Sequence, residues 1–428
     1  SLEPAEQNDL LARPAVRDDA RIREGAARIV ERVRRNGDTA VAELTRELDG
    51  AELTAFQVTG AEFSAAENAL DAAALDAIDV AIGNVRRFHE AQLPSPVTVE
   101  TMPGIRCERI SQPLDSVGLY VPAGTAPLPS AAVMLCVPAA LAGCPTRALC
   151  TPPRDDGSAD PAVLVAARRA GVSKVFKIGG AQAIAAMAYG TETVPRVVKI
   201  FGPGNAWVTA AKSLVAMDPA GAAIDLPAGP SEVLVIADDS ANPEYVAADL
   251  LSQAEHGTDS QVVLVCTAAS VGEAVIEATL AQLESLPRRS IAEVAIGNSR
   301  FIVAGDLSEA VEISNQYAPE HLILHTRAPR ALLASLRNAG SVFLGPWSPE
   351  SVGDYCSGTN HVLPTYGSAR SYSGLSVDQF LRQTTVQELT RAGLESIGSA
   401  VVTLAELEGL DAHARAVKCR LDNKGAGA

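Results

Sequence analysis

The sequence lacks the features that define several large classes of protein. Its longest apolar stretch, residues 131–141, is interrupted by Pro138 and falls short of the ~20 apolar residues that span a bilayer. It has no block of like charges, and its net charge of −16 argues against a nucleic-acid surface. No basic region followed by an apolar core opens the chain, so no secretory signal is expected. These absences predict a protein that binds neither nucleic acid nor membrane.

Cysteine chemistry is also poorly represented. The 7 cysteines include no C-x-x-C pair and their number is odd, which argues against a disulfide framework and against a thiolate zinc site. The H-E-x-x-H signature of zinc peptidases is absent as well. With free thiols as the default, we expect the reducing cytoplasm as the compartment.

Most of the chain alternates short β-branched runs with alanine-rich helical segments. Such alternation predicts parallel sheets covered by helices on both faces. A first set of predicted strands lies at 117–121, 148–151, 174–178, 197–200 and 222–226. A second set lies at 233–237, 262–266, 301–303, 322–325 and 342–344. We therefore predict an α/β protein with two parallel-sheet, Rossmann-like domains, one inserted in the other.

The predicted domain boundaries follow from this pattern. Residues 1–20 form an amino-terminal arm, residues 21–119 and 231–371 the first α/β domain, and residues 120–230 the inserted one. Residues 372–428 are expected to be a small, mostly helical tail. Within the first domain, residues 345–374 are dense in Gly, Pro, Ser and Thr, and a structureless loop of this length is usually functional.

Two glycine turns follow predicted strands and open predicted helices. Gly202-Pro203-Gly204-Asn205-Ala206-Trp207 resembles a dinucleotide fingerprint, but Trp207 replaces the third glycine. Gly179-Gly180-Ala181-Gln182 follows the preceding strand of the set. Helix amino termini at such junctions bind pyrophosphate, so both turns are candidate cofactor sites, each a weak signal alone.

Imidazole, carboxylate and amide side chains recur in three places. A helix that starts at Asn242 and is expected to stop at Gly257 carries Gln253 and His256 three residues apart, on one face. These two residues are either metal ligands or a solvated polar edge. Glu320-His321 precedes an apolar strand and is either an acid–base pair or a pair exposed to water. Glu408 and His413 lie in the tail, where surface polarity is the simpler interpretation.

Taken together, long ordered segments of the chain closely resemble the histidinol dehydrogenase family. The resemblance covers nearly the whole chain after the first twenty residues. It rests on VGLYVPAGTAP at 117–127, GGAQAIAAMAYGTE at 179–192, KIFGPGNAWV at 199–208, DLPAGPSEVLVIAD at 225–238, DLLSQAEHGTDSQV at 249–262, ISNQYAPEHL at 313–322 and SPESVGDYCSGTNHVLPTYG at 348–367.

The resemblance implies an NAD-dependent oxidation of L-histidinol to L-histidine through histidinaldehyde, the last steps of histidine biosynthesis. It implies one Zn²⁺ per subunit, with the ligands Gln253, His256, Asp354 and His413. The implied acid–base pair is Glu320 and His321, and the implied NAD contacts are Tyr120, Gln182 and Asn205. The implied substrate contacts are Ser231, His321, His361 and Glu408, together with the four zinc ligands.

The family also forms an intertwined homodimer in which the tail completes the partner's site, which would place Glu408 and His413 in the other chain's pocket. In the reaction that the resemblance implies, His321 takes the hydroxyl proton and Glu320 activates the water that adds to the aldehyde. Zinc orients the substrate. No cysteine nucleophile is needed.

Two other functions are compatible with some of these residues. A zinc-dependent hydrolase would use Glu320 as its base, but would leave both glycine turns idle. A non-enzymatic protein that binds amino acids would have no use for a clustered zinc set. Reduction of NAD⁺ upon addition of histidinol separates all three hypotheses.

Overall fold

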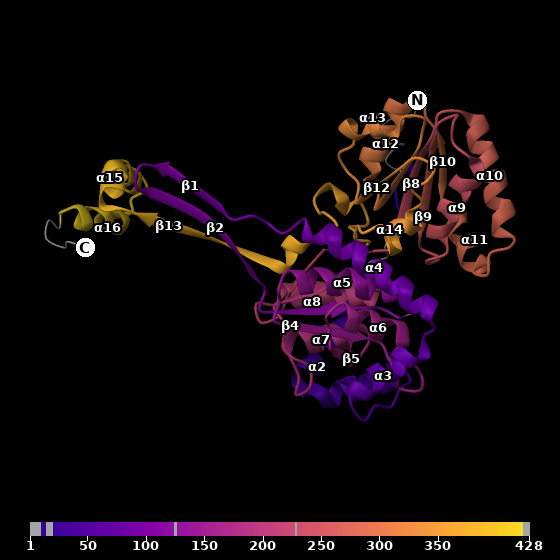
Figure 1. Ribbon diagram of the computed structural model, residues 1–428, viewed down its shortest axis with the longest axis horizontal. Helices are drawn as coiled ribbons and strands as arrows, with labels where there is room; N and C mark the ends of the chain where they lie inside the picture. Colours follow the sequence, from indigo (N-terminus) through magenta and orange to yellow (C-terminus); the bar gives the residue numbers. More distant parts are fainter. Residues whose placement is uncertain (1–9, 14–19, 124–125, 227–228, 423–428) are drawn as a thin grey trace. The chain divides into compact units, whose positions relative to one another are not determined.

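The computed structural model describes residues 10–13, 20–123, 126–226 and 229–422 (Figure 1). Internal contacts divide the chain into a larger unit, Ser1–Gln92 with Leu114–Phe380, and a smaller unit, Leu93–Pro113 with Leu381–Ala428. Within the described ranges, no helix is long and apolar enough to cross a membrane.

The larger unit contains two five-stranded parallel sheets, which confirms the predicted fold class. The first has the strand order β5-β4-β3-β6-β7. Because the order reverses between β3 and β6, the carboxyl ends of these two strands flank the crevice where open α/β sheets bind ligands. Its strands are β3 (Ser116–Tyr120), β4 (Thr146–Thr151), β5 (Lys174–Lys177), β6 (Lys199–Phe201) and β7 (Ala223–Ile224).

Helices cover both faces of this sheet. On one face, α2 (Ala20–Leu48), α7 (Gly180–Tyr189) and α8 (Ala206–Met217) share a hydrophobic core with the strands. On the other lie α5 (Pro129–Leu141) and α6 (Pro161–Arg169), against which α3 (Gly60–Ala69) and α4 (Ala72–Glu90) pack.

The amino-terminal helices differ from the predicted domain division. The sequence pattern groups residues 21–119 with residues 231–371, yet Val30 and Val33 of α2 lie in the core of the first sheet. The reason is physical, since periodicity reveals that a helix has a buried face but not which sheet covers it. The remaining domain boundaries stay a prediction.

The second sheet has the order β10-β9-β8-β11-β12, which repeats the topology of the first. Its strands are β8 (Glu232–Ala237), β9 (Gln261–Cys266), β10 (Arg300–Val303), β11 (His321–His325) and β12 (Ser341–Leu344). One face packs on α9 (Pro243–Ala254), α10 (Ala269–Leu283) and α11 (Arg289–Gly297), and the other on α12 (Leu307–Tyr317) (Figure 1). Helix α13 (Pro329–Leu332) precedes β12. Every predicted run of the two sheets is a strand.

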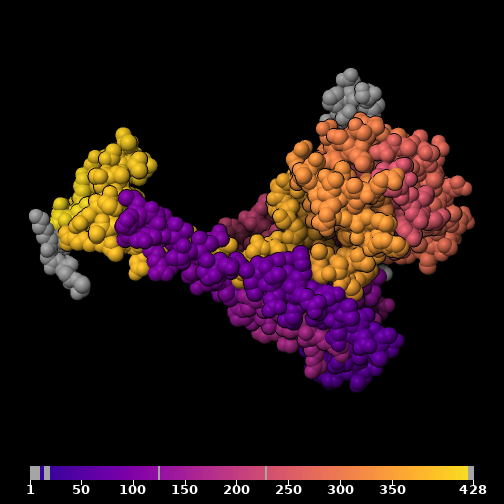
Figure 2. Space-filling model, turned by 45° about the horizontal axis from the view of Figure 1, so that its top comes forward, coloured from indigo at the N-terminus to yellow at the C-terminus, as the bar shows by residue number. Residues whose placement is uncertain are grey.

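The segment at 345–374 is more ordered than expected. It contains a short helix, α14 (Glu350–Tyr355), where the sequence predicts a structureless loop. The loop that follows packs on α4, since the Asn84 side chain donates to the carbonyl of Cys356 at 2.8 Å. Figure 2 shows these orange residues against the purple amino-terminal helices of the same unit.

The smaller unit is an antiparallel sheet with two helices, which confirms the predicted helical tail and adds a sheet to it. The sheet has the order β1-β2-β13, formed by β1 (Val97–Met102), β2 (Ile105–Pro113) and β13 (Leu381–Leu389). Helices α15 (Arg391–Leu407) and α16 (Asp411–Asp422) pack against each other. The strands escaped prediction because all residues of β1 and most residues of β13 are exposed, so no buried apolar run marks them.

Candidate functional site

A cavity of about 1250 Å³ in the larger unit is lined by parts of both parallel sheets. The first sheet contributes the turn Gly202–Asn205, at the carboxyl end of β6. The second contributes Ser231, Glu320 and His321, which lie at the amino ends of β8 and β11. This second position is unusual, since parallel sheets generally place ligands at carboxyl ends.

The turn after β6 leads into the amino terminus of α8 and lines the cavity. Gly202 has φ +118, and an added Cβ would lie 2.2 Å from the carbonyl oxygen of Tyr120, so only glycine fits. Asn205 is the N-cap of α8, and its side chain accepts hydrogen bonds from the amides of Trp207 and Val208, both at 3.1 Å. The amino terminus of α8 therefore lines the cavity.

A buried ion pair holds this turn. Lys212 donates to the carboxylate of Asp225 at 2.5 Å and to the carbonyl of Gly202 at 2.8 Å. The amide of Gly202 donates in turn to Asp225 at 2.7 Å. Trp207, which stands where the fingerprint has its third glycine, packs its ring on Gly25 of α2. The close approach of α8 to α2 is therefore made possible by Gly25 of α2, and not by a third glycine in the turn.

Glu320 and His321 are buried side by side at the start of β11. The carboxylate of Glu320 accepts from the amide of Glu232 at 2.9 Å, and Nδ1 of His321 lies 3.1 Å from the carbonyl oxygen of Glu232. The imidazole Nε2 is buried without a hydrogen-bond partner among the described residues, and lies 3.6 Å from the carboxylate of Asp354. The predicted pair is thus not exposed to water.

Burial and crowded carboxylates perturb the titration of this pair. Burial raises the pKa of Glu320 to about 8, against the attraction of His321. For His321, burial lowers the pKa, but the carboxylates of Glu350, Glu320 and Asp354 outweigh it, so the pKa stands well above its usual value. Perturbations of this size with charged partners in a cavity are typical of functional sites.

A second cluster beside this pair has the spacing of a metal site. One ligand atom each from His256, Glu350 and Asp354 lies within 4.8 Å of the others. Desolvation lowers the pKa of His256, although its ring is partly open to solvent, and so favours the neutral imidazole that binds metals. Burial and the neighbouring carboxylate of Asp354 raise the pKa of Glu350 to about 8, against the attraction of His321. Negative charge in excess of positive charge fits a bound cation.

Helix α9 presents Gln253 to this cluster but ends before His256. Its C-cap is Glu255, so the predicted stop at Gly257 is two residues late, and His256 lies in the turn that follows. In the amide orientation that satisfies its neighbours, Gln253 donates to the carboxylate of Glu350 and accepts from the amide of Glu232 at 3.2 Å.

His361 reaches the cavity from the loop after α14. The neighbouring Asn360 fixes this loop, since its side-chain amide donates to the carbonyl of Met134 at 2.8 Å and lies 3.3 Å from Nε2 of the buried His89. Burial lowers the pKa of His361, and its Nε2 has no hydrogen-bond partner among the described residues.

Comparison with known proteins agrees with this geometry. The profile of the family described as histidinol dehydrogenase matches residues 12–421. The chain is 56% identical over 424 residues to the histidinol dehydrogenase of Xanthomonas axonopodis pv. citri, covering 98% of this chain and 97% of that protein. It is 53% identical over 422 residues to the one of Vibrio cholerae, covering 99% and 97%.

A solved structure matches as well. The crystal structure of histidinol dehydrogenase from Elizabethkingia anophelis has a TM-score of 0.95 and 44% identity, covering 98% of this chain and 96% of that one. The chain belongs to the histidinol dehydrogenase family. It is therefore an enzyme, an oxidoreductase of histidine biosynthesis, and a dehydrogenase of this family uses a nicotinamide cofactor.

The structure brings most, but not all, of the predicted site residues to this cavity. Those that line it are Asn205, Ser231, Gln253, His256, Glu320, His321, Asp354 and His361. Glu408 and His413 lie in the smaller unit, where both side chains are exposed.

The two other predicted cofactor contacts are buried, and neither is among the described residues that line the cavity. The hydroxyl of Tyr120 accepts from the amide of Gly180 at 2.9 Å. Gln182 donates to the carboxylate of Asp49 at 3.0 Å, and its own Oε1 is buried with no hydrogen-bond partner among the described residues. Burial raises the pKa of Asp49 to about 6, against its hydrogen bond from Gln182.

Glu350 belongs to the cluster with His256 and Asp354 but was not predicted from the sequence. It precedes Asp354 by four residues, and on a helix this spacing places both carboxylates on one face. That signal is in the sequence, but it is visible only if residues 350–355 are expected to be helical.

Replacing Glu320 with glutamine should change how stability depends on pH in the metal-free protein. Between its usual pKa of 4.5 and the folded-state value of about 8, folded Glu320 keeps a proton that the unfolded chain has released. The folded state therefore loses stability as pH rises through this window, by about 1.4 kcal/mol for each unit of pKa difference. Glutamine does not titrate. The free energy of unfolding of Glu320→Gln, measured with urea, should therefore rise relative to that of the wild type between about pH 6 and pH 8.5.

A control with an exposed side chain is Glu284→Gln, which should follow the wild type at both pH values. A stability difference between Glu320→Gln and the wild type that is the same at both pH values would contradict the assigned shift.

Proposed function

We propose that the chain oxidises L-histidinol to L-histidine through histidinaldehyde, with two molecules of NAD⁺ as successive hydride acceptors. The observation that carries this proposal is the cavity itself, which is lined by both the helix amino terminus after β6 and the buried Glu320–His321 pair. The names of the relatives supply the substrate.

The cofactor is assigned to the first sheet. The amino terminus of α8, capped by Asn205, lines the cavity, and its helix dipole favours a pyrophosphate there; NAD⁺ bound at this place would supply the hydride acceptor. Tyr120 and Gln182 remain proposed contacts. Tyr120 supports the second glycine turn through the amide of Gly180, so its effect on the cofactor is expected to pass through that turn.

Zinc is assigned to the cluster beside the acid–base pair. Gln253, His256 and Asp354 would hold it, with His413 from another copy of the chain as fourth ligand and Glu350 as a further candidate. These nitrogen and oxygen donors suit Zn²⁺. When bound, it would orient the nitrogen atoms of the substrate and offset the carboxylates that raise the pKa of His321.

The hydrogen bond from Nδ1 of His321 to the carbonyl of Glu232 determines which nitrogen acts as the base. With the Nδ1 proton held there, the neutral ring has its free lone pair on Nε2, which has no partner in the described part of the chain. His321 then accepts the hydroxyl proton as hydride leaves the carbinol carbon for NAD⁺.

Glu320 is assigned to the second oxidation. The aldehyde gains water, and the resulting hydrate loses hydride from the same carbon and a proton. A buried carboxylate with a pKa of about 8 is a stronger base than an exposed one and matches neutral pH better. Ser231, His361 and the partner's copy of Glu408 are assigned to holding the substrate.

Turnover with histidinol is the direct test. We expect NADH absorbance to appear with histidinol and NAD⁺, with two NADH formed per histidine. A chelator should abolish the signal and added Zn²⁺ should restore it, because the carboxylates would lose the cation that balances them. Absence of NADH from the zinc-loaded protein would reject the function, and full activity in rigorously metal-free protein would reject the metal.

The division of labour between Glu320 and His321 is testable by single-turnover kinetics. His321→Asn should slow the reaction from histidinol and the one from histidinaldehyde by ~10²–10⁴, because a proton leaves in each. Glu320→Gln should slow mainly the reaction from histidinaldehyde, since only that step needs an added water. An equal loss in both steps for Glu320→Gln would show that the assigned roles are wrong.

The smaller unit supports a homodimer. Its exposed apolar side chains include Val99, Met102 and Ile110 on the sheet, and Leu404 and Leu407 on α15. Many large apolar side chains exposed on one small unit favour a protein–protein contact there. A second copy would cover it and bring His413 and Glu408 to the partner's cavity.

Mixed dimers test whether the tail serves the other chain. Glu320→Gln and His413→Ala should each form almost no histidine alone, yet their co-expression should restore about a quarter of the wild-type rate of histidine formation, since half of the dimers are mixed and each has one intact site. If the tail completes its own chain's cavity, co-expression restores nothing.

A further inference from the structure

The main chain of Glu232 connects the two members of the acid–base pair. Its amide donates to the carboxylate of Glu320 at 2.9 Å, and its carbonyl oxygen lies 3.1 Å from Nδ1 of His321. These contacts arise because β8 and β11 are adjacent parallel strands that begin at the same edge, with His321 paired to Val233. A shift of the Glu232 main chain would therefore displace the amide that Glu320 binds and the carbonyl oxygen that His321 binds.

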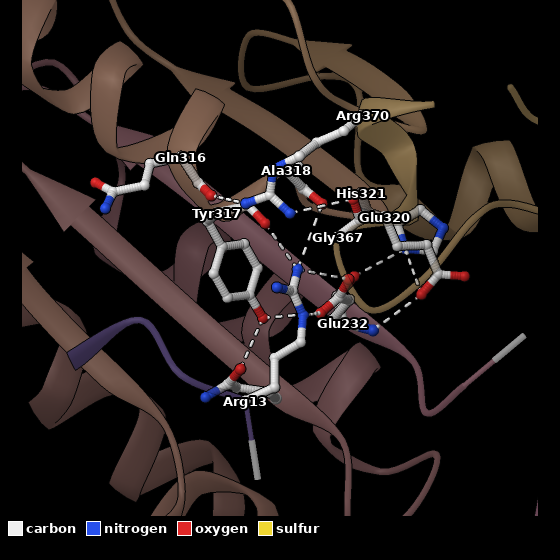
Figure 3. Close-up of polar contacts among 10 residues, drawn as sticks. Arg13, Glu232, Gln316, Tyr317, Ala318, Glu320, His321, Gly367 and Arg370 are labelled. Carbon is white, nitrogen blue, oxygen red and sulfur yellow. Dashed lines mark hydrogen bonds and ion pairs between the residues drawn. The ribbon is translucent and has the colours of Figure 1, made fainter. Parts of the chain in front are cut away.

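The side chain of Glu232 is fixed in turn by Arg13 from the amino-terminal segment (Figure 3). Nε and Nη2 of Arg13 donate to the two carboxylate oxygens at 2.6 and 3.0 Å. The side chain of Glu232 is only 2% exposed, and a buried carboxylate requires a charge partner. A bidentate guanidinium is the partner that restricts orientation most.

Arg13 also holds the turn that leads into Glu320. Its Nη2 donates to the carbonyl of Tyr317 at 2.8 Å, and its guanidinium lies 4.0 Å from the centre of the Tyr317 ring. The next residue, Ala318, is in the left-handed region with φ 54, which is strained for a residue with a Cβ. Strain of this kind persists only where surrounding contacts impose it.

Tyr317 completes the contacts around this carboxylate. Its hydroxyl lies 2.9 Å from Glu232 and 2.8 Å from the side-chain oxygen of Gln261, the first residue of β9. The first residues of three neighbouring strands, β9, β8 and β11, are therefore joined around Arg13.

We propose that Arg13 is a positioning residue for the Glu320–His321 pair, acting through the buried carboxylate of Glu232 and the turn at Ala318. Arg13 is not among the described residues that line the cavity, so it is not expected to touch substrate or cofactor. Its loss should therefore lower kcat more than it raises either KM. This inference rests on the proposed function, which gives Glu320 and His321 their roles.

The kinetic test compares three variants of the zinc-loaded enzyme. Arg13→Met should lower kcat by about 10-fold or more, with both KM values within about 3-fold of the wild type. Arg13→Lys should recover only part of kcat, because an ammonium group cannot bind both oxygens in one plane. Arg327→Met is the matched control, since Arg327 also forms a two-contact pair, with the exposed Asp239, and should leave kcat unchanged. An unchanged kcat in Arg13→Met overturns the proposal.

A double variant separates positioning from mere charge balance. Arg13→Met leaves Glu232 buried without its partner and should lower the melting temperature. Arg13→Met combined with Glu232→Gln removes that charge, so stability should largely recover while kcat stays low. Recovery of both would show that Arg13 only neutralises Glu232, and would overturn the positioning role.

A spectroscopic measurement separates this proposal from the proposed function. In protein labelled with ¹⁵N-histidine, the Nδ1 signal of His321, assigned by its loss in His321→Asn, reports the hydrogen bond to Glu232. Arg13→Met should shift or broaden this signal, while Arg327→Met should not. A wild type without turnover but with this shift rejects the function and retains the positioning role. An active wild type with no shift in Arg13→Met rejects the positioning role alone.

Discussion

Mutual repulsion of buried carboxylates is the constraint on which the site depends. Glu232, Glu320 and Glu350 are each at most 6% exposed, and Asp354 lies beside them. Buried carboxylates that crowd one site cannot all stay ionised without positive charge nearby. Arg13 compensates Glu232, and His321 lies between Glu320 and Asp354. The negative charge that remains fits a bound cation, so the cluster of His256, Glu350 and Asp354 and the Glu320–His321 pair form one electrostatic unit.

The two parallel sheets have the same strand order but line the cavity with opposite ends of their strands. The first sheet offers the carboxyl end of β6 and the amino terminus of α8, which suit an anionic cofactor. The second offers the amino ends of β8, β9 and β11, where the buried carboxylates of Glu232 and Glu320 lie. Under the proposed function, this division would separate a site for the cofactor's phosphates from a site for a cation within one cavity.

Much of the fold was predictable because burial leaves a pattern in the sequence. Strands such as β8 and β9, buried along their whole length, read as continuous apolar runs. The antiparallel sheet of the smaller unit leaves no such pattern, since its strands are largely exposed within one chain. Helix α14 was also missed, because six residues without apolar periodicity give no helical signal.

The sequence by itself determined the residue types of the site, the two glycine turns and the family, because each depends on local order along the chain. Tertiary structure alone decided which of them meet. It buried Gln182 and Tyr120 outside the cavity lining, added Glu350 to His256 and Asp354, and joined Arg13 to Glu232 across 219 positions of the chain. Periodicity reports the face on which a side chain is buried, whereas strand pairing sets the partner that it finds there.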